Sequence, residues 1–170
     1  EIRMVTGVQT CALPISGATP DEREHLRLEE STSFRYLSHH RTSTSSNLAD
    51  AVKFNQLKEA FKTVGFPKKA VASICQILSA ILHLGNLDFV VDRSKNMDSA
   101  IVKNPHVLDI VAEFLGVDSP SLEATLVNKS MLVGGEMCGV FLDAEGAAAN
   151  RDDLARDRKS TRLNSSHHPD

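Results

Sequence analysis

The segment from Val71 to Leu87 (VASICQILSAILHLGNL) constrains most strongly what this chain can fold into. From Ala70 to Leu84 nearly every position is apolar or small, and the exceptions, which recur every three or four residues, are Ser73, Gln76, Ser79 and His83. On a helix with 3.6 residues per turn they form one thin polar stripe. A helix that is apolar over most of its circumference must be surrounded by other elements. The segment therefore predicts a buried central helix.

The ends of this helix carry recognisable signals. Pro67 suits the first turn, where its missing N–H costs nothing. Gly85 suits the position just past the end, where a left-handed residue closes the last turn. The apolar run is too short and too interrupted to span a bilayer, which needs about 20 apolar residues. We expect a helix packed inside protein.

Both ends of the chain look foreign to the protein. Val5–Ile15 reads VTGVQTCALPI, and Asp157–His167 reads DRKSTRLNSSH. The second string is the translation of a common sequencing adapter, and the first is the translation of its reverse complement. We therefore interpret 1–15 and 157–170 as adapter-derived segments without native structure, and 16–156 as the native part. The alternative is that both are natural tails.

Composition excludes few classes of function. The chain has 41% hydrophobic and 24% charged residues, which is typical of a soluble globular protein. Its net charge of −3 argues against a nucleic-acid partner. Without Cys11, the remaining Cys75 and Cys138 are neither a disulfide framework nor a metal site. The adjacent His39 and His40 fit a loop better than a metal centre.

The pattern predicts a mainly α fold of five or six helices, with one or two short β segments. Besides the central helix, a helix is expected within Asp21–Glu30, opened by Thr19-Pro20, and another at Asp50–Val64, with Phe54, Leu57, Phe61 and Val64 facing inward. A further helix is expected to begin at Asn104-Pro105 and to end at Gly116. Two more are expected to begin at Ser119-Pro120 and at Ala144. The expected extended pieces are Phe34–Leu37, Leu87–Val91, Met131–Val133 and Val140–Leu142, the last two around a turn at Gly134-Gly135. Asp92–Ala100 is expected to be exposed.

Motifs of catalysis and cofactor binding are missing from the sequence. It contains no G-x-x-x-x-G-K-[ST] phosphate loop, no G-x-S-x-G, no H-E-x-x-H and no cysteine pair at zinc spacing. We therefore predict no catalytic, cofactor-binding or metal-binding residue in this chain. His83 is expected to satisfy the last carbonyls of the buried helix as an imidazolium.

Four stretches resemble the myosin motor domain in order and spacing: Lys62–Phe66, Ile77–Asn86, Phe114–Val117 and Arg151–Arg156. The last is similar to the R-D-A-L-A-K sequence of that family, with Asp153 in place of Ala. The resemblance implies a helical, actin-side (upper) subdomain of a P-loop NTPase motor. It also implies that ATP and magnesium, the cofactors of an intact motor, are bound by residues outside this chain.

One residue of the family's actin-binding surface carries over. Myosins have an acidic or phosphorylatable residue on a surface loop, sixteen positions before the Asp of R-D-A-L-A-K. Counting back from Asp152 gives Glu136, which the resemblance makes a charged contact for actin. The alternative is a polar loop residue without a role.

A narrower resemblance concerns Glu136–Asp153 (EMCGVFLDAEGAAANRDD). It is similar to the motor-like domain fused to certain fungal chitin synthases. These are membrane-embedded glycosyltransferases that polymerise N-acetylglucosamine from UDP-N-acetylglucosamine with a divalent metal. The resemblance implies that the partners are the rest of the motor domain and F-actin, and that the membrane is reached only through another part of the protein.

Such a parent would lie at the cytoplasmic face of the plasma membrane or of secretory vesicles. Two alternatives stay open from the sequence. One is a conventional actin-based myosin ATPase, and the other is an interaction module that binds neither nucleotide nor actin.

Overall fold

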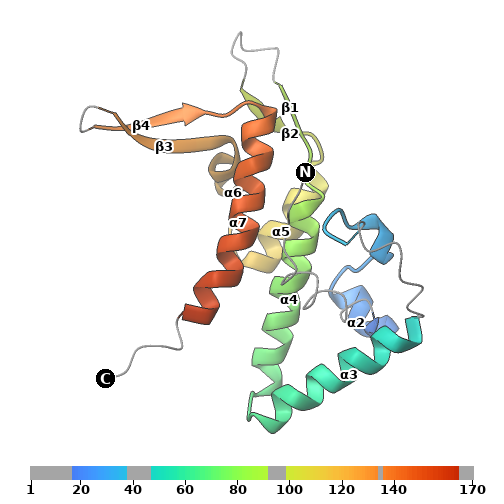
Figure 1. The fold of residues 1–170 in the computed structure, drawn as a ribbon. Helices are drawn as coiled ribbons and strands as arrows, with labels where there is room; N and C mark the ends of the chain where they lie inside the picture. Colours follow the sequence, from blue (N-terminus) through green and yellow to red (C-terminus); the bar gives the residue numbers. More distant parts are fainter. Residues whose placement is uncertain (1–16, 38–46, 92–98, 134–135, 165–170) are drawn as a thin grey trace, which may run out of the picture. The chain divides into compact units, whose positions relative to one another are not determined.

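The computed structural model describes residues 17–37, 47–91, 99–133 and 136–164 (Figure 1). The side chains of 47–49, 131–138 and 157–164 are outside this description. Predictions for 1–15, for His39-His40 and for the turn at Gly134-Gly135 therefore fall outside the described residues. The chain divides into two compact units, Glu1–Leu82 and His83–Asp170, and each unit is considered by itself.

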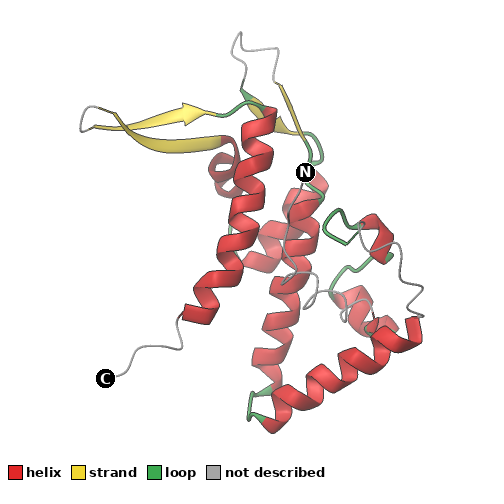
Figure 2. Ribbon diagram, in the orientation of Figure 1, coloured by secondary structure: helices red, strands yellow, loops and turns green. Residues whose placement is uncertain are grey.

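The described part is mainly helical, as predicted (Figure 2). Its six α-helices are α2 (Pro20–His25), α3 (Asn47–Thr63), α4 (Lys68–Gly85), α5 (Pro105–Leu115), α6 (Ser119–Val127) and α7 (Ala144–Asn164). The first three begin in unit 1, and the last turn of α4 enters unit 2. None of the helices in the described ranges is long and apolar enough to cross a membrane.

Helix α2 begins at the predicted cap. The Thr19 hydroxyl accepts a hydrogen bond from the Glu22 N–H at 3.4 Å, and the Glu22 carboxylate accepts one from the Thr19 N–H at 3.0 Å. This reciprocal pair satisfies N–H groups that have no partner within the helix.

The extended piece predicted at Phe34–Leu37 is wrong. After a 3₁₀ turn at Ser31–Ser33, residues 35–37 form another turn, in which the Leu37 N–H donates to the Phe34 carbonyl at 2.9 Å. Phe34, Tyr36 and Leu37 are all buried. An alternating strand would have put Leu37 on the opposite face from the other two, so the turn buries more apolar surface.

Residues 64–67 join α3 to α4, and the two helices diverge from this connection instead of packing side by side as a helical hairpin (Figure 1). Phe54 is buried, but the prediction that Val64 faces inward is wrong, because α3 ends at Thr63 and Val64 is 74% exposed. Gly65 has φ 91°, the left-handed conformation that glycine adopts readily just past the end of a helix. The rings of Phe61 and Phe66 meet edge to face across the connection, with centroids 5.5 Å apart.

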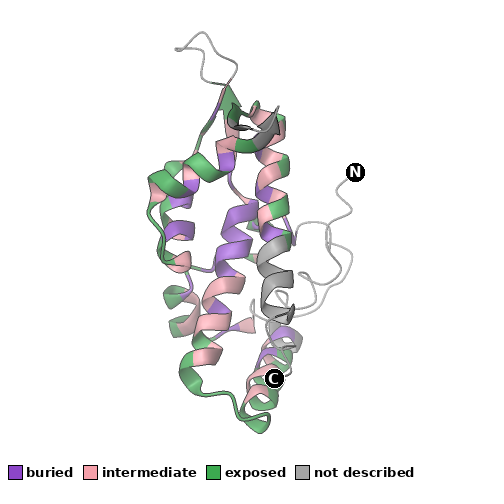
Figure 3. Cartoon of the chain, turned by 90° about the vertical axis from the view of Figure 1, so that its left-hand side faces the viewer, coloured by how far each residue is buried: buried purple, intermediate pink, exposed green. Residues whose placement is uncertain are grey.

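Helix α4 is the predicted central helix, but its burial is uneven. Figure 3 shows exposed and half-buried residues at its beginning and buried residues along its second half, where Ser79–Gly85 are all buried. In the first half, Val71, Ile74, Ile77 and Leu78 are only half-buried. Complete burial was therefore correctly predicted for the second half alone.

The two residues predicted to mark the ends of α4 each lie one position away from their predicted place in the helix. Pro67 precedes the helix, and its carbonyl accepts hydrogen bonds from the N–H groups of Ala70 and Val71 at 2.9 and 3.2 Å. Gly85 lies inside the helix, and its φ is not among the positive values of the described glycines. Instead, the Asn86 and Leu87 N–H groups bond three residues back and close the last turn without a left-handed residue.

Unit 2 begins with an antiparallel ribbon. Strand β1 (Phe89–Val91) lies in the stretch predicted to be extended, and it pairs with β2 (Ala100–Val102), which was not predicted. Ala100 was expected to be exposed and is buried instead. Ala100 is buried because it has neighbours on both sides: it pairs with Val91 in β1, and its N–H donates to the Leu142 carbonyl at 2.8 Å.

Helices α5 and α6 begin near their predicted positions with different capping. Asn104 precedes α5 but makes no cap hydrogen bond; its amide donates to the Asn86 carbonyl at 2.9 Å and accepts the Asp88 N–H at 3.0 Å. Helix α6 is capped by Asp118, which accepts the Ser121 N–H at 2.9 Å, rather than by Ser119. Gly116, with φ 69°, ends α5 as predicted.

Candidate functional site

The predicted actin contact lies on a β-hairpin of unit 2. Strand β3 (Asn128–Val133) pairs with β4 (Glu136–Phe141) in antiparallel register, from Asn128 opposite Phe141 to Val133 opposite Glu136. Glu136 is thus the first residue of β4, at the turn end of the hairpin (Figure 1). Its side chain lies outside the described residues, so its role stays a prediction. The strands are longer than the two short segments expected from the sequence.

The opposite end of this hairpin is anchored to the helices of unit 2. The Leu142 N–H donates to the Val127 carbonyl at 2.9 Å, and the Leu142 carbonyl accepts the N–H of Ala100 in β2. Asp143 then opens α7 by accepting the Gly146 N–H on its carboxylate at 2.7 Å. The hairpin therefore has a fixed base. Near that base, Val140 and Phe141 are exposed, Phe141 to 57%.

Arg151 joins α7 to the segment that follows α4. Its guanidinium donates to the Leu87 carbonyl at 2.7 Å and, through two further nitrogens, to the Asp152 carboxylate at 2.7 and 2.8 Å. The Arg151 side chain is only 3% exposed, and that of Asp152 is 17% exposed. A buried guanidinium is retained only where its charge and its donors have partners. Arg151 has both.

The residue before Arg151 makes a second connection. The Asn150 amide nitrogen donates to the Thr125 and Leu126 carbonyls at 2.8 and 3.0 Å, close to the end of α6. These two consecutive residues therefore bind α7 to two different backbone segments. The arrangement holds the helix that follows the hairpin, and so supports the position of the hairpin base.

His83 lies in the last turn of α4, as predicted, and it is buried. Its ring lies beside that of Phe114 in α5, with centroids 6.5 Å apart. The described geometry gives it a packing role. Its protonation stays a prediction.

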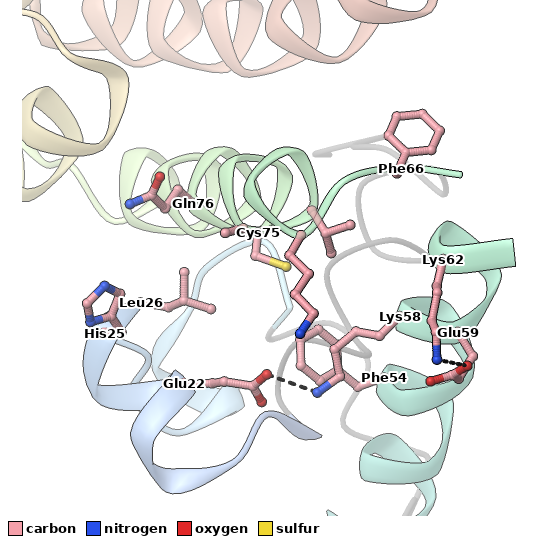
Figure 4. A pocket seen from close by; sticks show the side chains of 13 residues that line it. Glu22, His25, Leu26, Phe54, Lys58, Glu59, Lys62, Phe66, Cys75 and Gln76 are labelled. Carbon is pink, nitrogen blue, oxygen red and sulfur yellow. Dashed lines mark hydrogen bonds and ion pairs between the residues drawn. The ribbon is translucent and has the colours of Figure 1, made fainter. Parts of the chain in front are cut away.

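Unit 1 contains a cavity of about 600 Å³ between α2, α3 and α4 (Figure 4). Lys58 lies at its edge, 2.9 Å from the Glu22 carboxylate and 4.5 Å from the centre of the Phe54 ring. Burial alone would raise the pKa of Glu22, but hydrogen bonds from Lys58 and Thr19 outweigh it and hold that pKa below its ordinary value. Burial raises the pKa of the Cys75 thiol, which therefore lines the cavity in its protonated form.

Metal ligands do not gather in the parts of the chain that the structure describes, where no group of three or more His, Cys, Asp or Glu side chains could hold an ion. The polar side chains that converge in unit 2 bind backbone carbonyls and each other. These side chains are suited to holding helices and loops of unit 2 in place.

Comparison with known families decides the assignment, because the profile described as myosin head (motor domain) matches residues 13–163. The chain belongs to the myosin head family. This myosin head segment is 50% identical over 142 residues to "Chitin synthase 8" of Mycosarcoma maydis and 41% identical over 142 residues to "Chitin synthase 5" of Cryptococcus neoformans var. grubii. It is 35% identical over 160 residues to "Chitin synthase 6" of Verticillium dahliae.

The coverage of these alignments is unequal. Each includes 84% of this chain but only 7–8% of the relative, so the chain spans a small part of the curated relatives that it matches. The resemblance to the motor-like part of fungal chitin synthases is thereby confirmed for the myosin head segment itself.

Asp153 is the position where this myosin head segment departs from the family sequence expected at R-D-A-L-A-K. Its side chain is 70% exposed and pairs with that of Arg156, which is 54% exposed, at 2.6 Å. An exposed pair of this kind contributes about 0–1 kcal/mol. The substitution is therefore compatible with the fold, because position 153 faces away from the buried Arg151 network.

Two features were missed from the sequence. Arg151 belongs to the motif that resembles R-D-A-L-A-K, but an isolated arginine in a sequence gives no sign that its guanidinium will be buried. The cavity of unit 1 also gave no signal, because it depends on how three helices converge. The lysines at 58, 62 and 68 are the one pattern that could have drawn attention to it.

Proposed function

We propose that this chain is part of the myosin motor-like domain of a fungal chitin synthase, a membrane-embedded glycosyltransferase that polymerises N-acetylglucosamine from UDP-N-acetylglucosamine. The observation that carries the proposal is the 50% identity to a chitin synthase over 84% of the chain. Several further fungal chitin synthases align over the same share of the chain. The part described here takes no role in the glycosyl transfer.

The role of this segment in such a parent is actin-linked delivery or tethering of the enzyme. Its partners are the rest of the motor domain and F-actin, and it reaches the membrane only through other parts of the polypeptide. The parent would act at the cytoplasmic face of the plasma membrane or of secretory vesicles. Placement of Glu136 at the turn end of a hairpin with a fixed base supports an actin contact there.

The cofactors of the parent belong elsewhere in the polypeptide. An intact motor binds ATP with magnesium, and the synthase uses a divalent metal. The sequence of this chain offers no phosphate loop, and no acidic cluster in the described residues fits a metal. We propose that residues outside this segment carry the nucleotide and metal chemistry.

The first test is to sequence the genomic locus outward from both ends of the native part. A reading frame that continues into membrane spans and glycosyltransferase motifs is expected. A frame that continues instead into a converter and light-chain-binding helices would refute the synthase assignment in favour of a conventional myosin. The same sequence tests the terminal segments, because a genome that encodes them would refute their adapter origin.

The second test addresses Glu136. In the complete motor domain, Glu136→Ala is expected to weaken co-sedimentation with F-actin, most strongly at low salt, because charge at an interface acts mainly through long-range attraction. Glu145→Ala, which removes an exposed acid from the first turn of α7, is the matched control. Equal actin affinity of the Glu136→Ala protein and the unaltered protein would refute the contact.

A further inference from the structure

The cavity of unit 1 is apolar inside. Its wall is formed by Leu26, which directly follows α2, by Phe54 from α3, and by Val71 and Cys75 from α4. Figure 4 shows the Leu26 and Cys75 side chains on the inner side of the helices. Phe66 stands at its border and is 44% exposed. Its volume of about 600 Å³ is large enough for several side chains. Apolar walls around such a space are better covered by apolar groups than by water.

The cavity lies beside the half of α4 that is incompletely covered. Val71 lines the cavity and is half-buried, whereas the residues of the second half of the helix are buried. A helix that is apolar over most of its circumference needs neighbours along its whole length. Within the described residues, the face of α4 that lines the cavity includes the half-buried Val71 and the exposed Ala72.

The charges at the border favour an acidic partner. Lys58 and Lys62 are paired with Glu22 and Glu59, but Lys68 adds a further positive charge at the first residue of α4. The first turn of α4 contains no acidic residue. The N-terminus of a helix carries partial positive charge, which acidic groups stabilise and lysines do not. This border is thus electrostatically unbalanced without an acid supplied from elsewhere.

We propose that the cavity receives another segment of the same polypeptide, from outside the 170 residues, that inserts an aromatic or branched apolar side chain and places an Asp or Glu beside Lys68. This inference rests on the proposed function, in which the chain is one part of a much larger protein. The small share of the relatives that the chain spans, 7–8% for those named above, supports an occupant from the same polypeptide.

The experiment places a photo-crosslinking benzoylphenylalanine in the complete protein. Position 72 is chosen because Ala72 is exposed and lines the cavity; position 60 is the control, because Ala60 is exposed on α3 and does not line it. After irradiation, mass spectrometry identifies the crosslinked peptides. Position 72, but not position 60, is expected to crosslink to a peptide of the same polypeptide that contains an apolar side chain next to an acid.

A charge-reversal pair sharpens this test. Lys68→Glu is expected to reduce the crosslink from position 72 severalfold, whereas Lys69→Glu, which alters the same helix end outside the cavity wall, is expected to leave it unchanged. Equal yields in the two variants would refute the acidic contact.

Three outcomes at position 72 would overturn the docking proposal: no crosslink, a crosslink to a different protein, or a retained small molecule in place of a peptide. A protein that makes chitin but gives no such crosslink refutes the docking alone. A protein with the crosslink but without glycosyltransferase motifs refutes the synthase assignment alone.

Discussion

Replacing Arg151 by methionine tests the buried network that holds α7. Methionine has a similar length and leaves the helix intact. It removes the hydrogen bond to the Leu87 carbonyl and both contacts with the Asp152 carboxylate. The carbonyl then loses this charged donor, and the carboxylate keeps its charge without the cation beside it.

The expected loss of stability follows from burial. Breaking a buried ion pair by removing one partner costs about 3–5 kcal/mol. The Asp152 side chain is 17% exposed, so water partly compensates the remaining charge, and the expected loss is near the lower end, about 3 kcal/mol. In a chain of 170 residues this corresponds to a fall in Tm of about 6–12 °C.

The matched control is Arg156→Met, on the same helix. Arg156 pairs with Asp153 at 2.6 Å, but both side chains are more than half exposed, so its replacement should cost about 0–1 kcal/mol. Urea unfolding of each chain, followed by far-UV circular dichroism, gives the free energy of unfolding. If Arg151→Met destabilised the chain no more than Arg156→Met, the structural role of the buried guanidinium would be refuted.

Two predictions concern unit 1. Because the pKa of Glu22 is lowered in the folded state, its ion pair stabilises unit 1 above the ordinary carboxyl pKa, and this stabilisation is lost as the pH falls through the lowered pKa. Glu22→Gln should therefore reduce the urea midpoint at neutral pH and leave it unchanged in strong acid. An equal reduction at both pH values would contradict this. Ser79→Ala should lower the free energy of unfolding by about 1–3 kcal/mol, since the buried Leu26 carbonyl loses a hydrogen bond of 2.6 Å. The control Ser73→Ala removes only an exposed hydrogen bond within α4. Equal losses of stability in both variants would show that the hydrogen bond to Leu26 is unimportant.

Local signals in the sequence predicted the helices well. Capping residues and apolar periodicity act within one turn, so Thr19 and Gly116 could be assigned from their neighbours alone. Gly85 was misassigned because a helix end can also close through bonds from the next two N–H groups, and sequence does not distinguish the two endings. The sequence predicts Asn104 as a cap, but its amide forms hydrogen bonds with residues sixteen and eighteen positions away.

The candidate site depends more on long-range contacts. Glu136 was located by counting sixteen residues back from Asp152, which needs the sequence alone. The burial of Arg151 depends on the Leu87 carbonyl, 64 residues earlier in the chain, which no local pattern reveals. Strand β2 is three residues long and is fixed by its partners on either side, so its own sequence did not predict it.

The amide of Asn104 has a consequence for how this region tolerates changes of length. It holds residues 86 and 88 at the base of the β1–β2 ribbon, where the Lys103 N–H also donates to the Asp88 carbonyl at 2.8 Å. The ribbon is therefore closed at its base, independently of how many residues join Val91 to Ser99. Doubling the length of such a connection costs only about 0.6 kcal/mol in closure entropy. Evolution can lengthen it, and an experimenter can insert an epitope tag there, without changing the register of the strands.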